Sequence, residues 1–319
     1  MPDPIPDLAP AAPPVPPGPQ VRPEATAAAQ GLTIEARSQL RMILERFIHH
    51  RIALASLAFF IGLILFSTVG PLFWNINYAA ITDQFNTAPT WAHPFGTDPI
   101  GHDMFAQVMA AEATSVKTAL VVAVVSTIIG TIIGALAGYY GGWADSLLMR
   151  FTDLVLAIPI LAILLVLANV ASKHANSWLW IAIIIAALIW TYLARLVRGS
   201  FLSLREREYV EAAHAIGARD GRIIMRHMLP NAIGPVIVNG TLTVANAMLL
   251  ESFLSFLGLG IQPPEVSLGN LIAANQGSAV VFPWLFYIPS LFLVVTILAV
   301  NFIGDGMRDA FDPQQRVRQ

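Results

Sequence analysis

The stretch ALVVAVVSTIIGTIIGALAGY, residues 119–139, decides the fold because it carries no charged side chain over 21 consecutive positions. A helix of about 20 apolar residues is long enough to cross the hydrocarbon core of a bilayer. Further apolar runs of similar length lie at residues 52–73, 151–170, 178–196, 232–257 and 282–303. The sequence therefore predicts an all-α polytopic membrane protein with six transmembrane helices.

Three glycines of this stretch, Gly130, Gly134 and Gly138, stand four residues apart and share one face of the expected helix. Small residues at this spacing let a neighbouring helix approach closely within a membrane. The alternative is that they are tolerated glycines on a lipid-facing surface. Three glycines in register favour helix packing, so we expect this face to lie against another helix.

The composition agrees with a membrane location. The 319-residue chain is 56% hydrophobic and only 12% charged, and its mean hydropathy is +0.65. These values lie outside the usual range of soluble domains. The chain contains no cysteine, which excludes disulfides, thiolate metal sites and cysteine nucleophiles.

The basic residues predict the orientation. Five arginines precede the first span, Arg150 follows the second, seven lie at residues 195–226 and three follow the last span. With the N-terminus inside, 16 of the 18 lysines and arginines lie on the cytoplasmic side, and only Lys117 and Lys173 lie outside. Because cytoplasmic loops are enriched in Lys and Arg, we expect both termini in the cytoplasm (N-in/C-in).

The regions at the two ends differ in character. Ten of the 22 prolines fall within the first 23 residues, a density that predicts a disordered tail over residues 1–30. Residues 31–51 alternate apolar and basic positions at near-helical spacing, which predicts an amphipathic helix on the cytoplasmic face. The transmembrane domain then covers residues 52–304, and residues 305–319 form a cytoplasmic tail.

The first outer loop contains the segment HPFGTDPIGHD, residues 93–103. His93, Asp98, His102 and Asp103 are residue types that ligate metals, but their spacing is not diagnostic of a metal site. The prolines and glycines between them favour consecutive turns in which Asp side chains accept hydrogen bonds from the backbone. We therefore predict turns and no metal.

A few polar residues fall within or beside the spans. Arg150 and Asp153 stand three apart at the inner end of the third span, which favours an i,i+3 ion pair. Glu251, followed by Ser252, falls near the outer end of the fifth span, where it either lines a pathway as an outer gate or is an interfacial carboxylate close to water. Pro159, Pro283 and Pro289 are expected to kink their helices.

The sequence argues against two kinds of transporter: a stand-alone proton-coupled carrier and a protein that binds and hydrolyses ATP itself. No chain of acidic residues lies at mid-depth, which counts against a stand-alone proton-coupled carrier. No GxxxxGK[ST] phosphate loop occurs anywhere in the chain. If transport is active, its energy comes from a different chain.

The segment REREYVEAAHAIGARDGRIIMRHMLP, residues 205–230, is a charged island between two apolar runs. Residues 206–216 are good helix formers, and Gly217 is placed to end that helix in a left-handed conformation. Asp220 can cap a second short helix that runs to Pro230. The prediction is a cytoplasmic helical hairpin whose alanines Ala212, Ala213 and Ala215 offer a slim surface to a partner, although a solvated charged loop is an equal alternative.

The island resembles the EAA loop of ATP-binding-cassette (ABC) importer permeases. Glu211, Ala212 and Ala213 are followed after three residues by Gly217 and later by Leu229 and Pro230, as in that loop. Segments 93–105, 251–270 and 303–313 resemble the dipeptide and oligopeptide branch, the DppC and OppC type. The likeness covers residues 40–313. It departs from the branch at His102, where arginine is usual, and at residues 111–113, which read Ala-Glu-Ala.

The resemblance implies a type I ABC importer permease fold in a bacterial cytoplasmic (inner) membrane, with the EAA loop at residues 198–231. Glu211, Ala212, Ala213, Gly217, Leu229 and Pro230 would dock on an ATPase. The implied partners are a second homologous permease (DppB- or OppB-like), two ABC ATPase subunits (DppD- or DppF-like), an extracytoplasmic peptide-binding protein and membrane lipid, with no nucleic acid.

The resemblance also implies a non-catalytic permease subunit. The chain itself binds no cofactor, while ATP and Mg belong to the partner ATPases. The expected cargo is a dipeptide or a short oligopeptide. Nickel and glutathione importers of the same branch share these motifs and stay open as alternatives.

Overall fold

The computed structural model describes residues 39–171 and 176–311. The predicted tail at 1–30, the start of the predicted amphipathic helix and the end of the C-terminal tail lie outside the described residues. The chain divides into two compact units, residues 1–42 and 43–319, and the fold below is that of the second unit.

The described residues are helical throughout their regular structure. The main helices are α2 (Gln39–His49), α3 (Arg51–Thr68), α4 (Gly70–Phe73), α5 (Met104–Tyr140), α6 (Gly142–Ala157), α7 (Ile160–Ala171), α8 (Ser177–Arg205), α9 (Glu208–Ala215), α10 (Asp220–Ile223), α11 (Leu229–Phe256), α12 (Leu268–Asn275) and α13 (Pro283–Phe311), with a π-helical segment at Ile224–Met228 and a 3₁₀ turn at Gln276–Ser278.

The prediction of spans is confirmed for five of the six apolar runs. Five described helices are long and apolar enough to cross a membrane, and α6 with α7 makes a sixth if the bent pair counts as one span. The sixth run, predicted at residues 151–170 with a kink at Pro159, forms part of two helices, α6 and α7, which meet at 82°. The break falls at Pro159, which cannot donate the helical hydrogen bond and disfavours helix in the residue before it.

Several helices extend beyond the predicted apolar runs. α5 begins at Met104 rather than at residue 119, so the end of the predicted first outer loop is helical. Its first turns carry Gln107, Glu112 and Ser115, all buried against other helices. A hydropathy pattern understates such a helix because its polar side chains face protein and not lipid.

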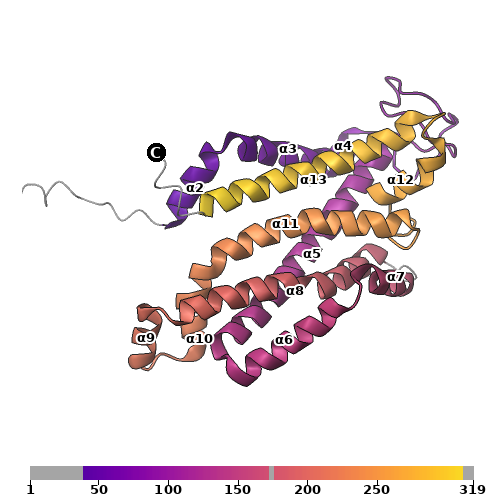
Figure 1. Ribbon diagram of the computed structural model, residues 1–319. Coiled ribbons are helices and arrows are strands. Elements are labelled where there is room, and N and C mark those ends of the chain that lie inside the picture. The colour runs from indigo at the N-terminus through magenta and orange to yellow at the C-terminus, as the bar shows by residue number, and fades with distance from the viewer. Residues whose placement is uncertain (1–38, 172–175, 312–319) are drawn as a thin grey trace, which may run out of the picture. The chain divides into compact units, whose positions relative to one another are not determined.

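The helices pack in a consistent order. α3 lies against α13, α13 against α11, α11 against α8, and α8 against α6 and α7, while α5 crosses this row and packs most extensively on α8 (Figure 1). The hairpin of α9 and α10 lies at one end of the long helices α8 and α11, and α7 and α12 lie near the other end of these helices. Pro283 is the first residue of α13 and Pro289 lies inside that unbroken helix.

The contact between α5 and α8 depends on the three spaced glycines. A Cβ atom added at Gly130 would lie 2.8 Å from the carbonyl oxygen of Trp190, and one at Gly138 would lie 2.6 Å from Cβ of Phe201. One at Gly134 would overlap the carbonyl oxygen of Ala194. The face that carries the glycines therefore lies directly against the backbone of α8.

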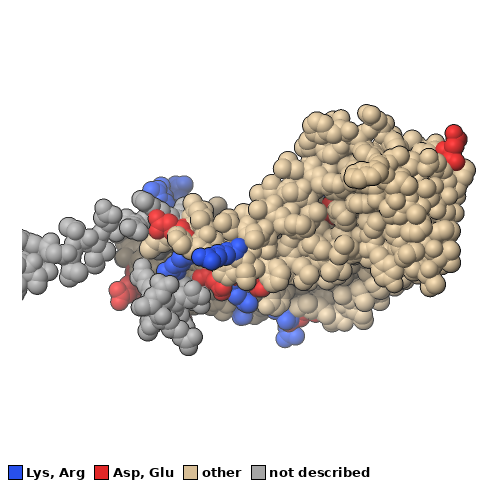
Figure 2. Space-filling view, turned by 90° about the horizontal axis from the view of Figure 1, so that it is seen from above, with Lys and Arg blue, Asp and Glu red and all other residues tan. Residues whose placement is uncertain are grey.

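Large apolar side chains cover much of the remaining surface. Ile52, Phe59 and Leu65 of α3 are each close to half exposed or more, which suits a surface in contact with lipid tails. Lys, Arg and most Asp and Glu side chains gather toward one end of the face shown in Figure 2, and the rest of that face is almost free of charge.

Candidate functional site

The turn after α9 is closed by a glycine. Gly217 has a φ of 75°. Its N–H donates to the carbonyl of His214 at 2.9 Å, and the N–H of Ala218 donates to the carbonyl of Ala213 at 3.0 Å. This pair of bonds is the Schellman motif of a helix C-terminus, so the prediction that Gly217 ends the helix is confirmed.

α9 has one face on the protein and one face free. Val210 and Ala213 are buried in a cluster with Phe201 of α8, Ile223 and Met228. Glu211, Ala212, Ala215 and Gly217 are exposed. The prediction that Ala213 belongs to the slim outward surface is therefore wrong. Val210 and Ala213 stand three apart and together face inward, a pattern that the helical period could have revealed.

The second arm of the hairpin differs from the prediction. The N-cap of α10 is Arg219, and Asp220 makes no capping hydrogen bond with its side chain. The arm also does not end at Pro230: a π-helical segment joins α10 to α11, and Pro230 lies in the first turn of α11, where proline is tolerated. The hairpin is thus continuous with the fifth span, so a displacement of the arm acts directly on that span.

Tyr139, which the sequence analysis did not single out, joins both arms of the hairpin to α5. Its hydroxyl donates to Oδ1 of Asp220 at 2.9 Å. Its ring stacks on His214 of α9 at 6.1 Å between centroids, and its carbonyl accepts from Arg205 at 3.2 Å. The C-terminal end of α5 is therefore held by the last turn of α8 and by both hairpin helices.

Two ion pairs tie α6 to α8. The guanidinium of Arg198 binds both oxygens of Asp145, and Arg195 pairs with Asp153. The predicted pair between Arg150 and Asp153 is therefore wrong. α8 packs against α6, and the long side chain of Arg195 reaches the carboxylate from the neighbouring helix, which a pattern within one helix cannot anticipate.

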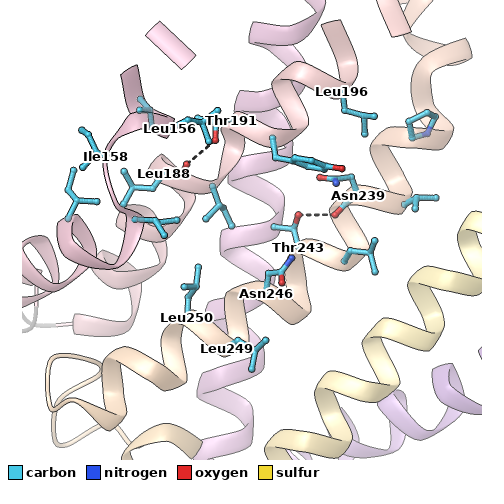
Figure 3. Close-up of a pocket in the computed structure, with 18 of the residues that line it drawn as sticks. Leu156, Ile158, Leu188, Thr191, Leu196, Asn239, Thr243, Asn246, Leu249 and Leu250 are labelled. Atoms are coloured by element: carbon cyan, nitrogen blue, oxygen red, sulfur yellow. Dashed lines mark hydrogen bonds between the residues drawn. The ribbon is translucent and has the colours of Figure 1, made fainter. Parts of the chain in front are cut away.

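A cavity of about 1100 Å³ opens between the bent pair α6 and α7, α8, α11 and the end of α13 (Figure 3). Its wall is mostly aliphatic. The polar side chains on it are Thr191, Tyr192, Asn239, Thr243, Asn246 and Arg308. These residues come from segments far apart in the chain, so the sequence pattern does not predict this site.

Three of these polar residues form a stripe on α11. Asn239, Thr243 and Asn246 follow at intervals of four and three residues, so they share one side of the helix, and Figure 3 shows them along the cavity wall. The Thr243 hydroxyl donates to the carbonyl of Asn239 at 2.8 Å. The side-chain amides of both asparagines have no hydrogen-bond partner among the described residues, so they can bind a guest in the cavity.

Glu251 lies near the end of the fifth span, as expected, but its surroundings differ from the prediction. The residue is 0% exposed, so the readings as a pathway-lining side chain and as a carboxylate close to water are both wrong. Ser115 of α5 donates to it at 3.0 Å and Ser255 at 2.7 Å. Ser252, also buried, lies 3.5 Å from the same carboxylate. Neighbouring hydroxyls replace water around this group.

A second buried carboxylate, Glu112, lies one turn before Ser115 on α5. Its Oε1 accepts from Thr296 of α13 at 2.9 Å, and its Oε2 has no hydrogen-bond partner. The departure from the family pattern at residues 111–113 thus places an acidic group between α5 and α13.

The segment at 93–103 forms turns, as predicted. Asp98 accepts from the backbone N–H groups of Ile100, Gly101 and His102 and lies 2.8 Å from the ring of His102. Asp103 caps α5 by accepting from Phe105. The residues described in the structure include no group of three or more His, Cys, Asp or Glu that could hold a metal ion.

Comparison with known proteins identifies the family. Residues 130–317 match the family model for the binding-protein-dependent transport system inner membrane component. The chain belongs to this family. Residues 38–90 match the model for the N-terminal transmembrane domain of oligopeptide transport permease C. With five to six apolar helices, it is a multi-pass inner-membrane protein.

Curated relatives cover nearly the whole chain. A Brucella suis protein whose name describes it as a peptide permease is 43% identical over 85% of this chain and 89% of its own length. The oligopeptide transport system permease protein OppC of Mycobacterium tuberculosis is 40% identical over 88% of this chain and 97% of its own. The OppC of Haemophilus influenzae is also 40% identical, over 89% and 92%.

A solved structure supports the fold. An inward-facing conformation of the MetNI methionine ABC transporter superposes with a TM-score of 0.52 at 18% identity, over 66% of this chain and 98% of that one. The predicted permease fold is therefore confirmed, and the ABC importer family is established by the sequence matches.

Proposed function

We propose that this chain is one half of the membrane pathway of an ATP-driven importer of dipeptides or short oligopeptides. A second, homologous permease forms the other half. Two separate ABC ATPases bind ATP and Mg, and an extracytoplasmic binding protein delivers the cargo. The chain itself performs no catalysis. Its relatives carry peptide or oligopeptide permease names, which supports this assignment.

The hairpin around α9 carries the coupling part of the proposal. Val210 and Ala213 pack α9 against the helix bundle. The exposed residues Glu211 and Ala212 therefore lie on a helix whose opposite face is buried. A hollow of about 600 Å³ beside them is lined by Arg205, Glu206, Glu211, His214 and Leu202. The hollow is lined by both basic and acidic side chains, so a charged side chain of the partner could form an ion pair there. An ATPase seated on this face would move the hairpin, and the continuous second arm would transmit the movement to α11.

The cavity supports peptide as the cargo. Among the described residues that line it, Arg308 alone is charged, and the other polar groups are amides and hydroxyls. These groups match the neutral donors and acceptors of a peptide backbone. Nickel prefers imidazole, carboxylate or thiolate ligands, and the lining contains none of them. This observation favours peptides over the nickel alternative.

Uptake measurements with hairpin variants test the coupling. Glu211→Lys reverses a charge on the exposed face. Gly217→Pro places proline, whose ring fixes φ at roughly −65°, at a position where the backbone has a φ of 75°. Both variants are expected to reach the membrane in normal amounts and to lose ATP-dependent uptake of labelled peptide. The matched control is Asp305→Lys, the same kind of charge reversal at an exposed site of α13, which should keep uptake. Wild-type uptake by both hairpin variants would contradict the coupling role.

The cargo is tested in the same vesicles. Labelled di-, tri- and tetrapeptides are supplied with the binding protein, and unlabelled peptide, glutathione or Ni²⁺ is added as competitor. Competition by peptides and none by Ni²⁺ is the expected result. Transport of Ni²⁺ without transport of peptide would replace the proposed cargo.

A further inference from the structure

The carboxylate of Glu251 is the centre of a hydrogen-bonded cluster at the outer end of α11. Ser115 and Ser255 each donate to it. Each of these hydroxyls also accepts: Ser115 from the N–H of Leu268 at 3.2 Å and Ser255 from the N–H of Ile261 at 3.3 Å. The donor and acceptor of both serines are thus fixed. One buried group links α5, α11 and the segment at 257–268.

This segment, which connects α11 to α12, is attached at both of its ends. Ser267, the N-cap of α12, donates to Ser255 at 3.1 Å. A Cβ atom added at Gly269 would lie 2.6 Å from Cα of Ser252, so the start of α12 lies directly on α11. Gln262 also donates from its N–H to Ser177 at the start of α8 at 3.0 Å. The segment therefore bridges three of the long helices.

The opposite side of the same turn of α11 faces the cavity. Leu249 and Leu250 line it, and Figure 3 shows both at the end of the cavity away from Leu196. Successive residues of an α-helix are turned by roughly 100°, so Leu249 and Glu251 point about 200° apart. If Glu251 is anchored toward α5, Leu249 must face the cavity.

We propose that Glu251 is the positioning residue of an outer gate, whose hydrogen bonds to Ser115 and Ser255 hold the last turns of α11 so that Leu249 and Leu250 close the outer end of the cavity. The inference rests on the proposed function, because it takes the cavity as half of the import pathway. It differs from a pathway-lining role, since the carboxylate itself never meets the cargo. Opening toward the outside then requires this cluster to break or to move as a unit.

The chemistry of the cluster explains why a carboxylate is needed. Two hydroxyl donors converge on Glu251, and a carboxylate accepts on both oxygens. Glutamine has the same shape but offers one acceptor and two donors, so one serine would lose its partner. The change is small in volume and specific for the hydrogen bonds.

The absence of cysteine in the chain gives a direct test in the assembled transporter. Leu249→Cys is labelled in sealed right-side-out vesicles with a membrane-impermeant maleimide, without ATP and binding protein. Labelling is expected to be slow with Glu251 intact. Adding Glu251→Gln should speed it by roughly tenfold or more, the shift expected when a buried hydrogen bond is lost from one of two states. ATPase activity in the absence of binding protein should rise in parallel.

Three controls make the result decisive. Ser115→Ala and Ser255→Ala remove one donor each and should have the same effect, so the test survives if Glu251→Gln fails to accumulate. Ser126→Ala removes a buried hydroxyl that bonds only to the carbonyl of Ala123 on its own helix, so this variant should leave labelling slow. A reporter at Ile216→Cys, on the hairpin, should stay unlabelled in every variant and shows that the vesicles are sealed.

Unchanged labelling of Leu249→Cys in the glutamine variant and in both alanine variants of Ser115 and Ser255 overturns the proposal. Because this readout needs no ATP, it does not depend on whether the hairpin variants lose uptake.

Discussion

At the scale of single residues, Tyr139 is the point at which the hairpin and α5 are joined. Its hydroxyl reaches Asp220 on the second arm, and its ring stacks on His214 on the first. Under the proposed coupling, movement of the hairpin would reach α5 through one side chain as well as through the continuous chain into α11. A hydrogen bond to a charged acceptor contributes about 1.5–3 kcal/mol, which is enough to bias a two-state element.

Tyr139→Phe tests this link because it removes the hydroxyl and keeps the stacked ring. We expect the variant to retain ATP hydrolysis by the assembled transporter but to import less peptide for each ATP hydrolysed. The measurement is the ratio of uptake to ATP hydrolysis in proteoliposomes. Tyr140→Phe is the matched control, since Tyr140 is 50% exposed and its hydroxyl has no hydrogen bond among the described residues. An unchanged ratio in Tyr139→Phe would show that α5 is not driven through this side chain.

At the scale of the elements, the α5 and α8 pair is the most extensive contact of the bundle. It depends on glycine because the backbone of α8 occupies the space where a Cβ of Gly130, Gly134 or Gly138 would lie. Neither helix can yield easily, since Ala194 and Val197 on the facing side are themselves buried. Any side chain added here must push the two helices apart.

Gly134→Ala is therefore expected to destabilise the protein by about 1–3 kcal/mol, as overpacking of a tight contact does. Thermal unfolding in detergent, followed by circular dichroism or by loss of soluble protein, measures the effect. Gly199→Ala on α8 is the matched control, because nothing lies within 4 Å of its added Cβ. That control should be neutral or stabilising by about 0.5–1 kcal/mol, since alanine favours helix over glycine. Equal stability of the two variants would mean that the close contact contributes nothing.

The elements also show how far the sequence could predict the fold. The apolar runs located the spans because the bilayer demands a fixed length of apolar helix, and the glycine spacing identified the contact face of α5. The pattern failed where polar residues face protein, as at Glu112 and Ser115, which hid the first turns of α5. It also failed at Pro159, where a kink was expected but the 82° bend was not.

At the scale of the whole molecule, the candidate sites could be predicted only where they are continuous in sequence. The hairpin is one stretch, so the end of its first helix at Gly217 could be predicted from the order of residues. The cavity and the Glu251 cluster draw on helices more than 100 residues apart, as the bond between Ser115 and Glu251 shows. Tertiary packing brings such groups together, and a pattern within one segment of the sequence cannot predict this packing.

The predicted orientation is a property of the whole chain, and the lack of cysteine makes it directly measurable. With 16 of 18 basic residues expected inside, the hairpin should face the cytoplasm and the segment before α5 the outside. Ile216 is 85% exposed on the hairpin and Trp91 is fully exposed in that segment. We expect Trp91→Cys to react with an impermeant maleimide in right-side-out vesicles and Ile216→Cys only in inverted ones. Permeabilised vesicles, in which both sites should react, control for access. The reverse pattern would invert the topology and place the hairpin out of reach of ATP in the cytoplasm, and the coupling proposal would fall with it.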